Sequence, residues 1–318
     1  MRLIPLVFPV STPALLTVLL AATTMLPASQ LIAQPAAAAK PKADAQAEHG
    51  TEWVRLRRDG KGRPLALEVA VVRYVSEQYA NKAPAKAPEY VDLVGAIHVG
   101  DLSYYRELNR RFRGYDALLY ELVAPKGTKV ERGRGTSSAH PLGAVQNGMK
   151  SMLELEHQLE KIDYTRPNFV HADLSPEEFF QSMEDKDESF LQLLFRMMGQ
   201  GIAAQSQQAA EGESADLDIF TALMSQDRAR KLKIALAKQF SSMELMLSGI
   251  SGPEGSTLIT ERNKRALDVL REQRAAGKRR LGIFYGAGHL TDMHERLVDD
   301  FGLQPIGTVW LEAWNLRP

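Results

Sequence analysis

One local pattern in the middle of the chain constrains the fold more than any other feature. An apolar stretch over 91–97 is followed by His98, and then by Asp101, a good N-cap residue, at the start of an amphipathic segment. A second short apolar stretch ends at Glu121. Strand, His-bearing turn, helix and Glu-bearing strand together predict a βαβ unit. Since ligands and catalytic groups gather at the carboxyl ends of strands in such sheets, we expect His98 and Glu121 at that edge.

The same pattern returns near the end of the chain. The stretch 280–285 predicts a strand, and a glycine follows it three residues before His289, at the spacing also found before His98. Glu312 follows His289 by 23 residues, the interval that also separates Glu121 from His98. This doubled GxxH pattern predicts two βαβ units in one α/β domain over 51–318, built on a central, mostly parallel, mixed sheet.

The first fifty residues predict export. Arg2 is the only charged residue before Lys40, and an apolar stretch over 14–26 is followed by small residues. These features are typical of a secretory signal peptide, which we place at 1–33, followed by a flexible tether over 34–50. The protein is therefore expected to be periplasmic or secreted. The alternative is an uncleaved segment that anchors the chain in a membrane.

Composition limits the partners. The 39 basic and 39 acidic residues cancel, so the chain has no net charge that would favour nucleic acid. There is no cysteine, which excludes disulfides and a lipid anchor on cysteine. Stability must then come from the apolar core or from a metal, and the sequence does not determine the oligomeric state.

The remaining segments predict the outer parts of the domain. Two strand-like stretches, 53–58 and 65–75, surround a Gly-containing turn and predict an N-terminal hairpin. The chain is mainly helical over about 142–250, and we interpret this inserted block as a cap on the site, or else as a structural or oligomerisation surface. Within it, a short strand that ends in His171 and Asp173 leads into a helix with a capping box.

The last long helix before the second GxxH motif, over 257–276, carries Arg262 and Asn263. Both residues fall within or beside its apolar arc at the helical period. An unpaired guanidinium is very costly to bury, so this one needs a partner. We predict that Arg262 pairs with an active-site carboxylate or with a bound anionic group.

Two imidazoles and one or more carboxylates at one sheet edge support two kinds of chemistry. They can hold a divalent metal that acidifies a bound water and polarises a carbonyl. Alternatively, one His acts as a general base oriented by a Glu, without a metal. Nucleophilic schemes fit less well, because the chain has no cysteine and no GxSxG motif.

Taken together, these residues resemble the TraB/GumN family, which groups with the TIKI proteases and, more distantly, with erythromycin-esterase-like and ChaN-like proteins. The resemblance covers roughly residues 50–314. It rests on the two GxxH motifs, Tyr120-Glu121, the strand-end Asp173 and Glu261-Arg262-Asn263.

The resemblance implies a divalent-metal-dependent peptidase, as in the TIKI branch, that acts on a small peptide or another small molecule. The metal, Mn, Co or Zn, would be held by His98, Glu121 and His289. Glu121 and His98 would take part in catalysis, and Arg262 would support them. Further candidates for the site are Asp173, Glu312, His171 and Asn263. The other relatives imply two alternatives, a metal-independent esterase-like hydrolase and a ligand- or haem-binding protein without turnover.

Overall fold

The computed structural model describes residues 52–81, 86–125, 127–128, 130, 153–186, 221–222, 224–248 and 256–318, with the backbone alone over 239–248. The predicted signal peptide and tether lie outside the described residues. All of the described residues belong to one compact unit. None of the helices in the described part of the chain has the length and apolar character needed to cross a membrane.

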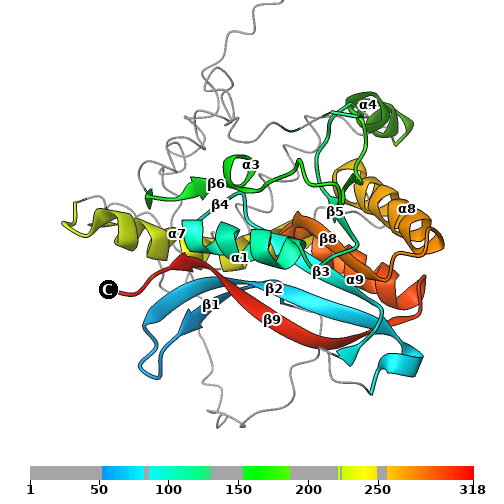
Figure 1. Cartoon of the computed structure of the whole chain (residues 1–318). Coiled ribbons are helices and arrows are strands. Elements are labelled where there is room, and N and C mark those ends of the chain that lie inside the picture. The colour runs from blue at the N-terminus through cyan, green and yellow to red at the C-terminus, as the bar shows by residue number, and fades with distance from the viewer. Residues whose placement is uncertain are drawn as a thin grey trace, which may run out of the picture. The chain divides into compact units, whose positions relative to one another are not determined.

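Within these residues the fold is built on a seven-stranded mixed sheet (Figure 1). Its strands are β1 (Val54–Arg58), β2 (Pro64–Ser76), β3 (Tyr90–Ala96), β5 (Ala117–Tyr120), β7 (Phe169–His171), β8 (Arg280–Gly286) and β9 (Leu303–Asn315). The strand order is β1-β2-β3-β8-β5-β7, and β9 also pairs with β2. Strands β3, β8, β5 and β7 are parallel, whereas β1, β3 and β9 all pair antiparallel with β2. The predicted α/β class and N-terminal hairpin are confirmed.

Helices and short turns connect these strands. They are η1 (Glu77–Tyr79), α1 (Leu102–Phe112), α3 (Gln158–Lys161), α4 (Pro176–Asp185), α7 (Arg228–Ser248), η3 (Thr257–Glu261), α8 (Arg262–Ala275), η4 (Ala287–His289) and α9 (Leu290–Asp299). A small two-stranded sheet joins β4 (Val99–Gly100) to β6 (Glu156–His157). Of the predicted helical block 142–250, the described residues include α3, α4 and α7, and the rest lies outside them. Helix α4 begins with the predicted capping box between Ser175 and Glu178.

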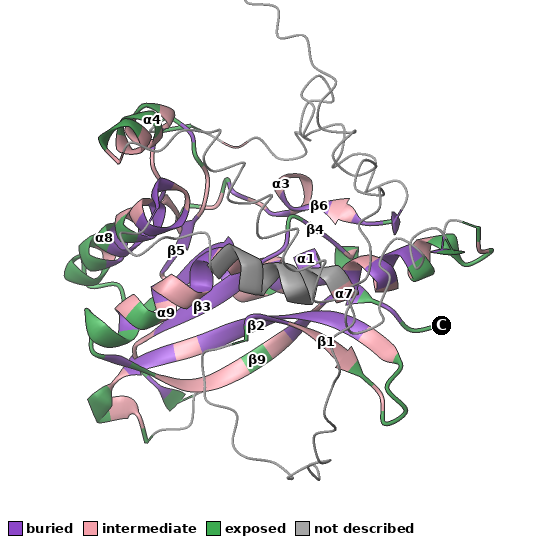
Figure 2. Ribbon diagram, turned by 180° about the vertical axis from the view of Figure 1, so that it is seen from behind, coloured by how far each residue is buried: buried purple, intermediate pink, exposed green. Residues whose placement is uncertain are grey.

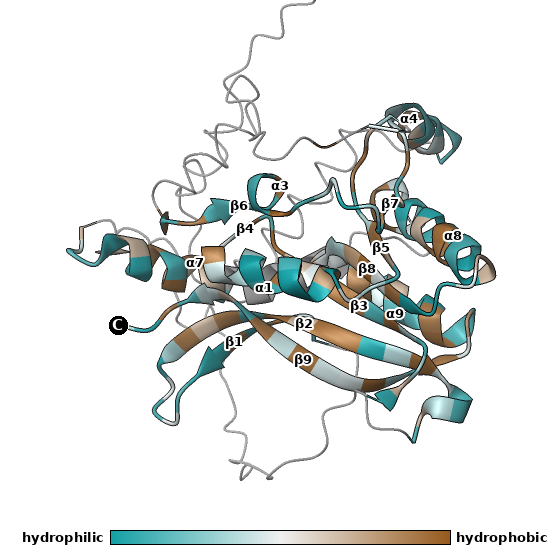
Figure 3. Ribbon diagram, viewed as in Figure 1, coloured by the Kyte–Doolittle hydropathy of each residue, from teal (hydrophilic) through white to brown (hydrophobic). Residues whose placement is uncertain are grey.

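The side chains of the strands alternate between two apolar layers, as the strand period of two requires. On β2, Leu67, Val69 and Val71 belong to the layer that contains α1, and Ala70, Val72 and Tyr74 to the layer that contains α8 and α9. Figure 2 shows the buried residues concentrated in the strands. Figure 3 shows β5 and β8 as mainly hydrophobic, and α1 and α4 as mainly hydrophilic.

The two βαβ units interlock, because β8 lies between β3 and β5. The first unit crosses from β3 over β8 to β5, and the second crosses from β8 in the opposite direction to β9. Two right-handed crossovers that run in opposite directions place their helices on opposite faces of the sheet. In agreement with this rule, α1 and α9 lie in different apolar layers. The ends of β3, β8 and β5 are thereby brought side by side.

Asp101 precedes α1 as predicted, but its carboxylate does not cap that helix. It accepts a hydrogen bond from Nζ of Lys233 on α7 at 2.8 Å, and another from the backbone N–H of Asn315. The carboxylate therefore ties α7 and the end of β9 to the first βαβ unit. Sequence alone favoured the local cap because both partners are more than 100 residues away.

Candidate functional site

The predicted site residues follow the ends of neighbouring parallel strands. His98 stands two residues after β3, and His289 three residues after β8. Glu121 directly follows β5, and its N–H donates to the carbonyl of Phe284 on β8 at 3.2 Å. Asp173 stands two residues after β7. The prediction that these residues lie at the carboxyl edge of the sheet is confirmed.

Arg262, at the start of α8, is the centre of the site. Its buried guanidinium donates from Nε and Nη2 to the two carboxylate oxygens of Asp173, at 2.9 and 2.7 Å. Nη2 also donates to Oε1 of Glu121 at 2.7 Å. Nη1 lies 3.3 Å from Nε2 of His289 and 3.5 Å from the carbonyl oxygen of Leu258. All five N–H groups of the guanidinium are thus engaged.

This geometry distinguishes the two roles predicted for Arg262. The guanidinium pairs with two carboxylates of the site, as one of the predictions required. With every N–H engaged, it has none left for a bound anion. We conclude that Arg262 holds Glu121, Asp173 and His289 in place.

The backbone before Arg262 helps to explain this placement. The turn η3 is a π-helical turn, wider than an α-helical one, and Ser256 caps its start through Oγ, which accepts from the N–H of Ile259. The guanidinium folds back over this turn to reach the Leu258 carbonyl. Such single π turns occur frequently at functional sites.

Glu121 is partly buried and uses both carboxylate oxygens. Oε1 accepts from Arg262 and lies 3.6 Å from Nε2 of His289, and Oε2 accepts from the backbone N–H of Gly286 at 2.7 Å. Burial alone would raise the pKa of Glu121, but the positive charges of His289, Arg262 and His98 and the Gly286 N–H lower it to about 2. Glu121 is therefore ionised at any physiological pH.

The pKa of His289 is itself lowered, chiefly because burial disfavours the charged ring. At neutral pH the ring is therefore neutral, and Arg262 and the Gly286 N–H remain to stabilise the Glu121 carboxylate. On its other side, Nδ1 of His289 lies 2.7 Å from Oδ1 of Asn263. Asn263 was predicted to lie near the site, and its amide contacts the ring directly.

The glycines of the two GxxH motifs serve close packing. A Cβ on Gly95 would stand 2.4 Å from Cγ1 of Val69, and a Cβ on Gly286 would stand 3.3 Å from Oε2 of Glu121. Neither glycine has a positive φ. The two glycines therefore allow close approach, in one copy to the neighbouring strand and in the other to the site carboxylate.

His98 is exposed on the turn between β3 and β4. Its charge is one of those that lower the pKa of Glu121, after the charges of His289 and Arg262. In the described part of the chain, no three His, Asp or Glu side chains converge as a set of metal ligands. The structure brings Glu121 and His289 together, and a metal shared with His98 stays a prediction.

Three of the further candidate residues lie at different places relative to the site. Asp173 is buried at 1% exposure and belongs to the Arg262 network. His171 borders the site, with Nε2 2.6 Å from the carbonyl oxygen of Leu122. Glu312 binds Arg57 at 3.1 Å and Arg317 at 2.6 Å, on a strand that β2 and β3 separate from β8. The sequence repeat therefore does not bring a second Glu into the site.

Sequence reasoning gave no role to Asp292, although it stands three residues after His289. Its Oδ2 accepts from Nδ2 of Asn263 at 2.8 Å, and Arg296 holds the same carboxylate. The signal was present in the repeat, because Asp101 has the corresponding position after His98. The two aspartates have different partners, so the repeat alone could not reveal the role.

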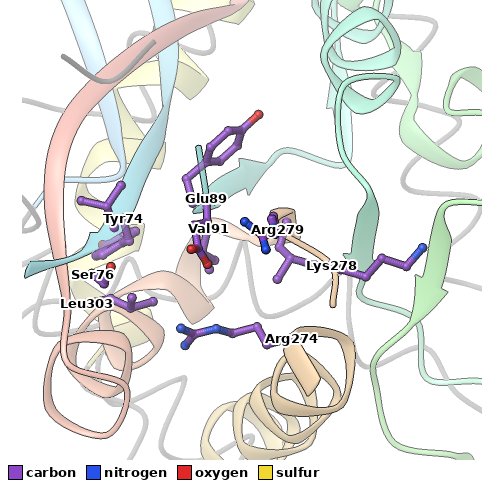
Figure 4. A pocket seen from close by; sticks show the side chains of 11 residues that line it. Tyr74, Ser76, Glu89, Val91, Arg274, Lys278, Arg279 and Leu303 are labelled. Atoms are coloured by element: carbon purple, nitrogen blue, oxygen red, sulfur yellow. The ribbon is translucent and has the colours of Figure 1, made fainter. Parts of the chain in front are cut away.

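A pocket at the opposite edge of the parallel strands is shown in Figure 4. It lies at the start of β3 and β8, and Val91 and Leu281 are among its lining residues. Its volume of about 20 Å³ has room for roughly one water molecule. A pocket of this size is too small for a peptide or a drug-sized ligand.

Comparisons with known proteins found no match to a family model, a curated protein or a solved structure. The functional argument therefore depends on the geometry and electrostatics of the site.

Proposed function

We propose that this protein is a hydrolase that cleaves an amide or ester bond, with a divalent cation held by Glu121 and His289. One observation carries the proposal: Nε2 of His289 lies 3.6 Å from Oε1 of Glu121. Two ligand atoms that each stand about 2.1 Å from one cation are separated by about 3.4 Å at a tetrahedral angle. The spacing of these two atoms therefore fits a shared cation.

The charge of the network supports a cation rather than an anion. Glu121 and Asp173 provide two carboxylates, Arg262 provides one positive charge, and His289 is neutral because burial lowers its pKa. The four side chains together carry a net charge of −1 in a largely buried place. An added cation would offset this charge, whereas a carboxylate of the substrate would add to it.

Each side chain has a defined part in this proposal. When bound, the cation would acidify a water molecule and polarise the carbonyl to be cleaved. Glu121 stays ionised and can act as a ligand, and His289 offers its second ring nitrogen. Arg262 holds both, and Asp173 keeps Arg262 in place. His98 is exposed, its charge is among those that lower the pKa of Glu121, and in this proposal it would be a third ligand or would exchange protons with solvent.

A second candidate is a hydrolase without a metal, in which Nε2 of His289 accepts the proton of the attacking water. The observation that favours it is the guanidinium of Arg262, whose Nη1 lies 3.3 Å from the same nitrogen. The positive charge of Arg262 opposes a cation at Nε2, although the contact would have to lengthen before Nε2 could either bind a cation or accept a proton. Both candidates use the same residues and differ only in their need for a metal.

The substrate and the location rest on the sequence. The resemblance to the TIKI branch supports a small peptide as the substrate. The signal peptide predicted over 1–33 supports a periplasmic or secreted enzyme. Sequencing the N-terminus of protein from the cell envelope tests the location, and an intact Met1 on a cytoplasmic product would contradict it.

Metal analysis combined with a turnover assay tests the function. The purified protein without residues 1–33 is assayed on pools of short peptides and simple esters, before and after exhaustive chelation. We expect about one divalent ion per chain, loss of turnover on chelation, and recovery with Mn, Co or Zn. Glu121→Ala and His289→Ala should abolish turnover and release the ion. Glu312→Ala changes the corresponding Glu of the second unit, and it should change neither the turnover nor the amount of bound ion.

The other outcomes each have a clear meaning. Undiminished turnover after chelation refutes the metal and supports the second candidate. Ligand or haem binding that shifts the absorbance spectrum or the thermal midpoint, without product from any pool, refutes a hydrolase and supports a binding protein.

A further inference from the structure

The imidazole of His289 is held between two consecutive residues of α8. Nη1 of Arg262 lies 3.3 Å from Nε2, and Oδ1 of Asn263 lies 2.7 Å from Nδ1. Successive residues of an α-helix point about 100° apart, so one turn presents a side chain to each ring nitrogen. We propose that Asn263 is a positioning residue that fixes the tautomer of His289, with the hydrogen on Nδ1 and the lone pair of Nε2 directed toward the site.

The orientation of the Asn263 amide follows from its other contacts. Nδ2 donates to the backbone carbonyl of His289 at 3.0 Å and to Oδ2 of Asp292 at 2.8 Å. Both partners are oxygens that accept only, so an amide turned by 180° would place its own oxygen against them. Oδ1 must therefore face the ring. Since that oxygen can only accept, Nδ1 of His289 carries the hydrogen.

Arg262 selects the same tautomer from the other side. A guanidinium has N–H donors and no acceptor, so the ring nitrogen that faces Nη1 has to accept. The opposite tautomer would direct an Nε2–H toward the N–H groups of Arg262. It would also leave two lone pairs facing each other between Nδ1 and Asn263. Both neighbours of the ring therefore exclude that form.

Helix α9 holds the amide in turn. Arg296 donates from Nε to Oδ2 of Asp292 at 2.9 Å and from Nη2 to Oδ1 at 3.1 Å. Asp292 is thereby fixed next to Asn263, which is itself fully buried. The chain of contacts runs from Arg296 through Asp292 and Asn263 to His289. Such outer contacts set the ring orientation and the tautomer of a ligating or proton-accepting His.

The consequence for activity depends on the proposed function, but the tautomer can be measured without it. Nitrogen-15 spectra of the imidazole rings distinguish a protonated Nδ1 from a protonated Nε2, and the signals lost in His289→Gln assign this ring among the seven histidines. We expect the wild-type ring to carry its hydrogen on Nδ1. Asn263→Leu should shift the population toward the Nε2–H form. It should also weaken the binding of Zn²⁺ alone by about 10- to 100-fold.

Two further variants make the test specific. The double exchange Asn263→Asp with Asp292→Asn keeps an acceptor for Nδ1, so it should keep the Nδ1–H form, at a cost in stability because the new carboxylate faces the backbone carbonyl of His289 and the new amide faces Arg296. Lys264→Leu, an exposed position on the same helix, should leave the tautomer and Zn²⁺ binding unchanged.

Three results would overturn the inference. They are a wild-type ring with its hydrogen on Nε2, a folded Asn263→Leu protein with an unchanged tautomer, and a folded double exchange with the Nε2–H form. If Asn263→Leu does not fold, the spectra of the wild-type protein and of the double exchange still show whether Nδ1 of His289 carries the hydrogen. If the wild-type ring shows the expected tautomer but the protein neither binds Zn²⁺ nor turns over a substrate, the proposed function is refuted. The role of Asn263 in fixing the tautomer is then still supported.

Discussion

Replacing Arg262 by Met removes the guanidinium that both Glu121 and Asp173 contact, and keeps an unbranched side chain. We expect the change to lower the free energy of unfolding by about 3–5 kcal/mol at neutral pH. Asp173 is 1% exposed and loses hydrogen bonds of 2.9 and 2.7 Å, and Glu121 loses one of 2.7 Å. Water cannot reach Asp173 to replace them.

The magnitude follows from these three bonds. Hydrogen bonds to charged groups contribute roughly 1.5–3 kcal/mol each, so three would sum to about 4.5–9 kcal/mol. The loss is smaller than this sum because one unpaired carboxylate can bind a proton instead of remaining charged. The folded variant then binds more protons than the folded wild type. Its deficit in stability should therefore shrink as the pH falls toward the ordinary carboxyl pKa.

Urea unfolding at pH 7 and pH 5, followed by circular dichroism, measures the effect. Lys264→Met is the matched control, because its 2.9 Å ion pair with Glu261 lies on the surface and Lys186 also contacts Glu261. An exposed pair of this kind contributes at most about 1 kcal/mol. If Arg262→Met stays within about 1 kcal/mol of the wild type at pH 7, the network does not hold the site together as argued.

Three other predictions concern the same site. The pKa of Glu121 is about 2 in the folded state against an ordinary 4.5, so its contribution is complete above pH 4.5 and is lost as the pH falls toward 2. Stability should therefore drop by up to about 3 kcal/mol across that window, and a profile that Glu121→Gln leaves unchanged would contradict this. Arg262→Lys should fold but turn over more slowly and bind Zn²⁺ more weakly, because an ammonium cannot contact both carboxylates as a fork. Unchanged kinetics would argue against the role of Arg262 in holding the two carboxylates. Gly286→Ala would bring a Cβ to 3.3 Å from Oε2 of Glu121 and should weaken Zn²⁺ binding. The control Gly60→Ala, whose Cβ would have nothing within 4 Å, should not. Equal Zn²⁺ affinities of the two variants would show that the close approach of Gly286 to Glu121 does not matter for binding.

Local patterns were enough to predict which residues stand at the carboxyl edge. His98, Glu121, Asp173 and His289 each follow a short apolar strand, and each of these strands was recognisable from its own sequence. The buried arginine was also predictable, because Arg262 falls on the apolar side of a helix and a buried charge needs a partner. These patterns do not give the order of the strands in the sheet. That order determines which carboxylates become the partners of Arg262.

The order of the strands explains why a repeated sequence gives an unrepeated site. Strand β8 lies between β3 and β5, so His289 emerges next to Glu121, the glutamate of the other unit. The second unit crosses toward β9, on the far side of β2, and Glu312 pairs with arginines there. A site with its own Glu for each His would have needed β9 beside β8. In the fold adopted, Glu121 serves His289 together with Arg262, and the second carboxylate on Arg262, Asp173, leaves the net negative charge on which the proposed cation depends.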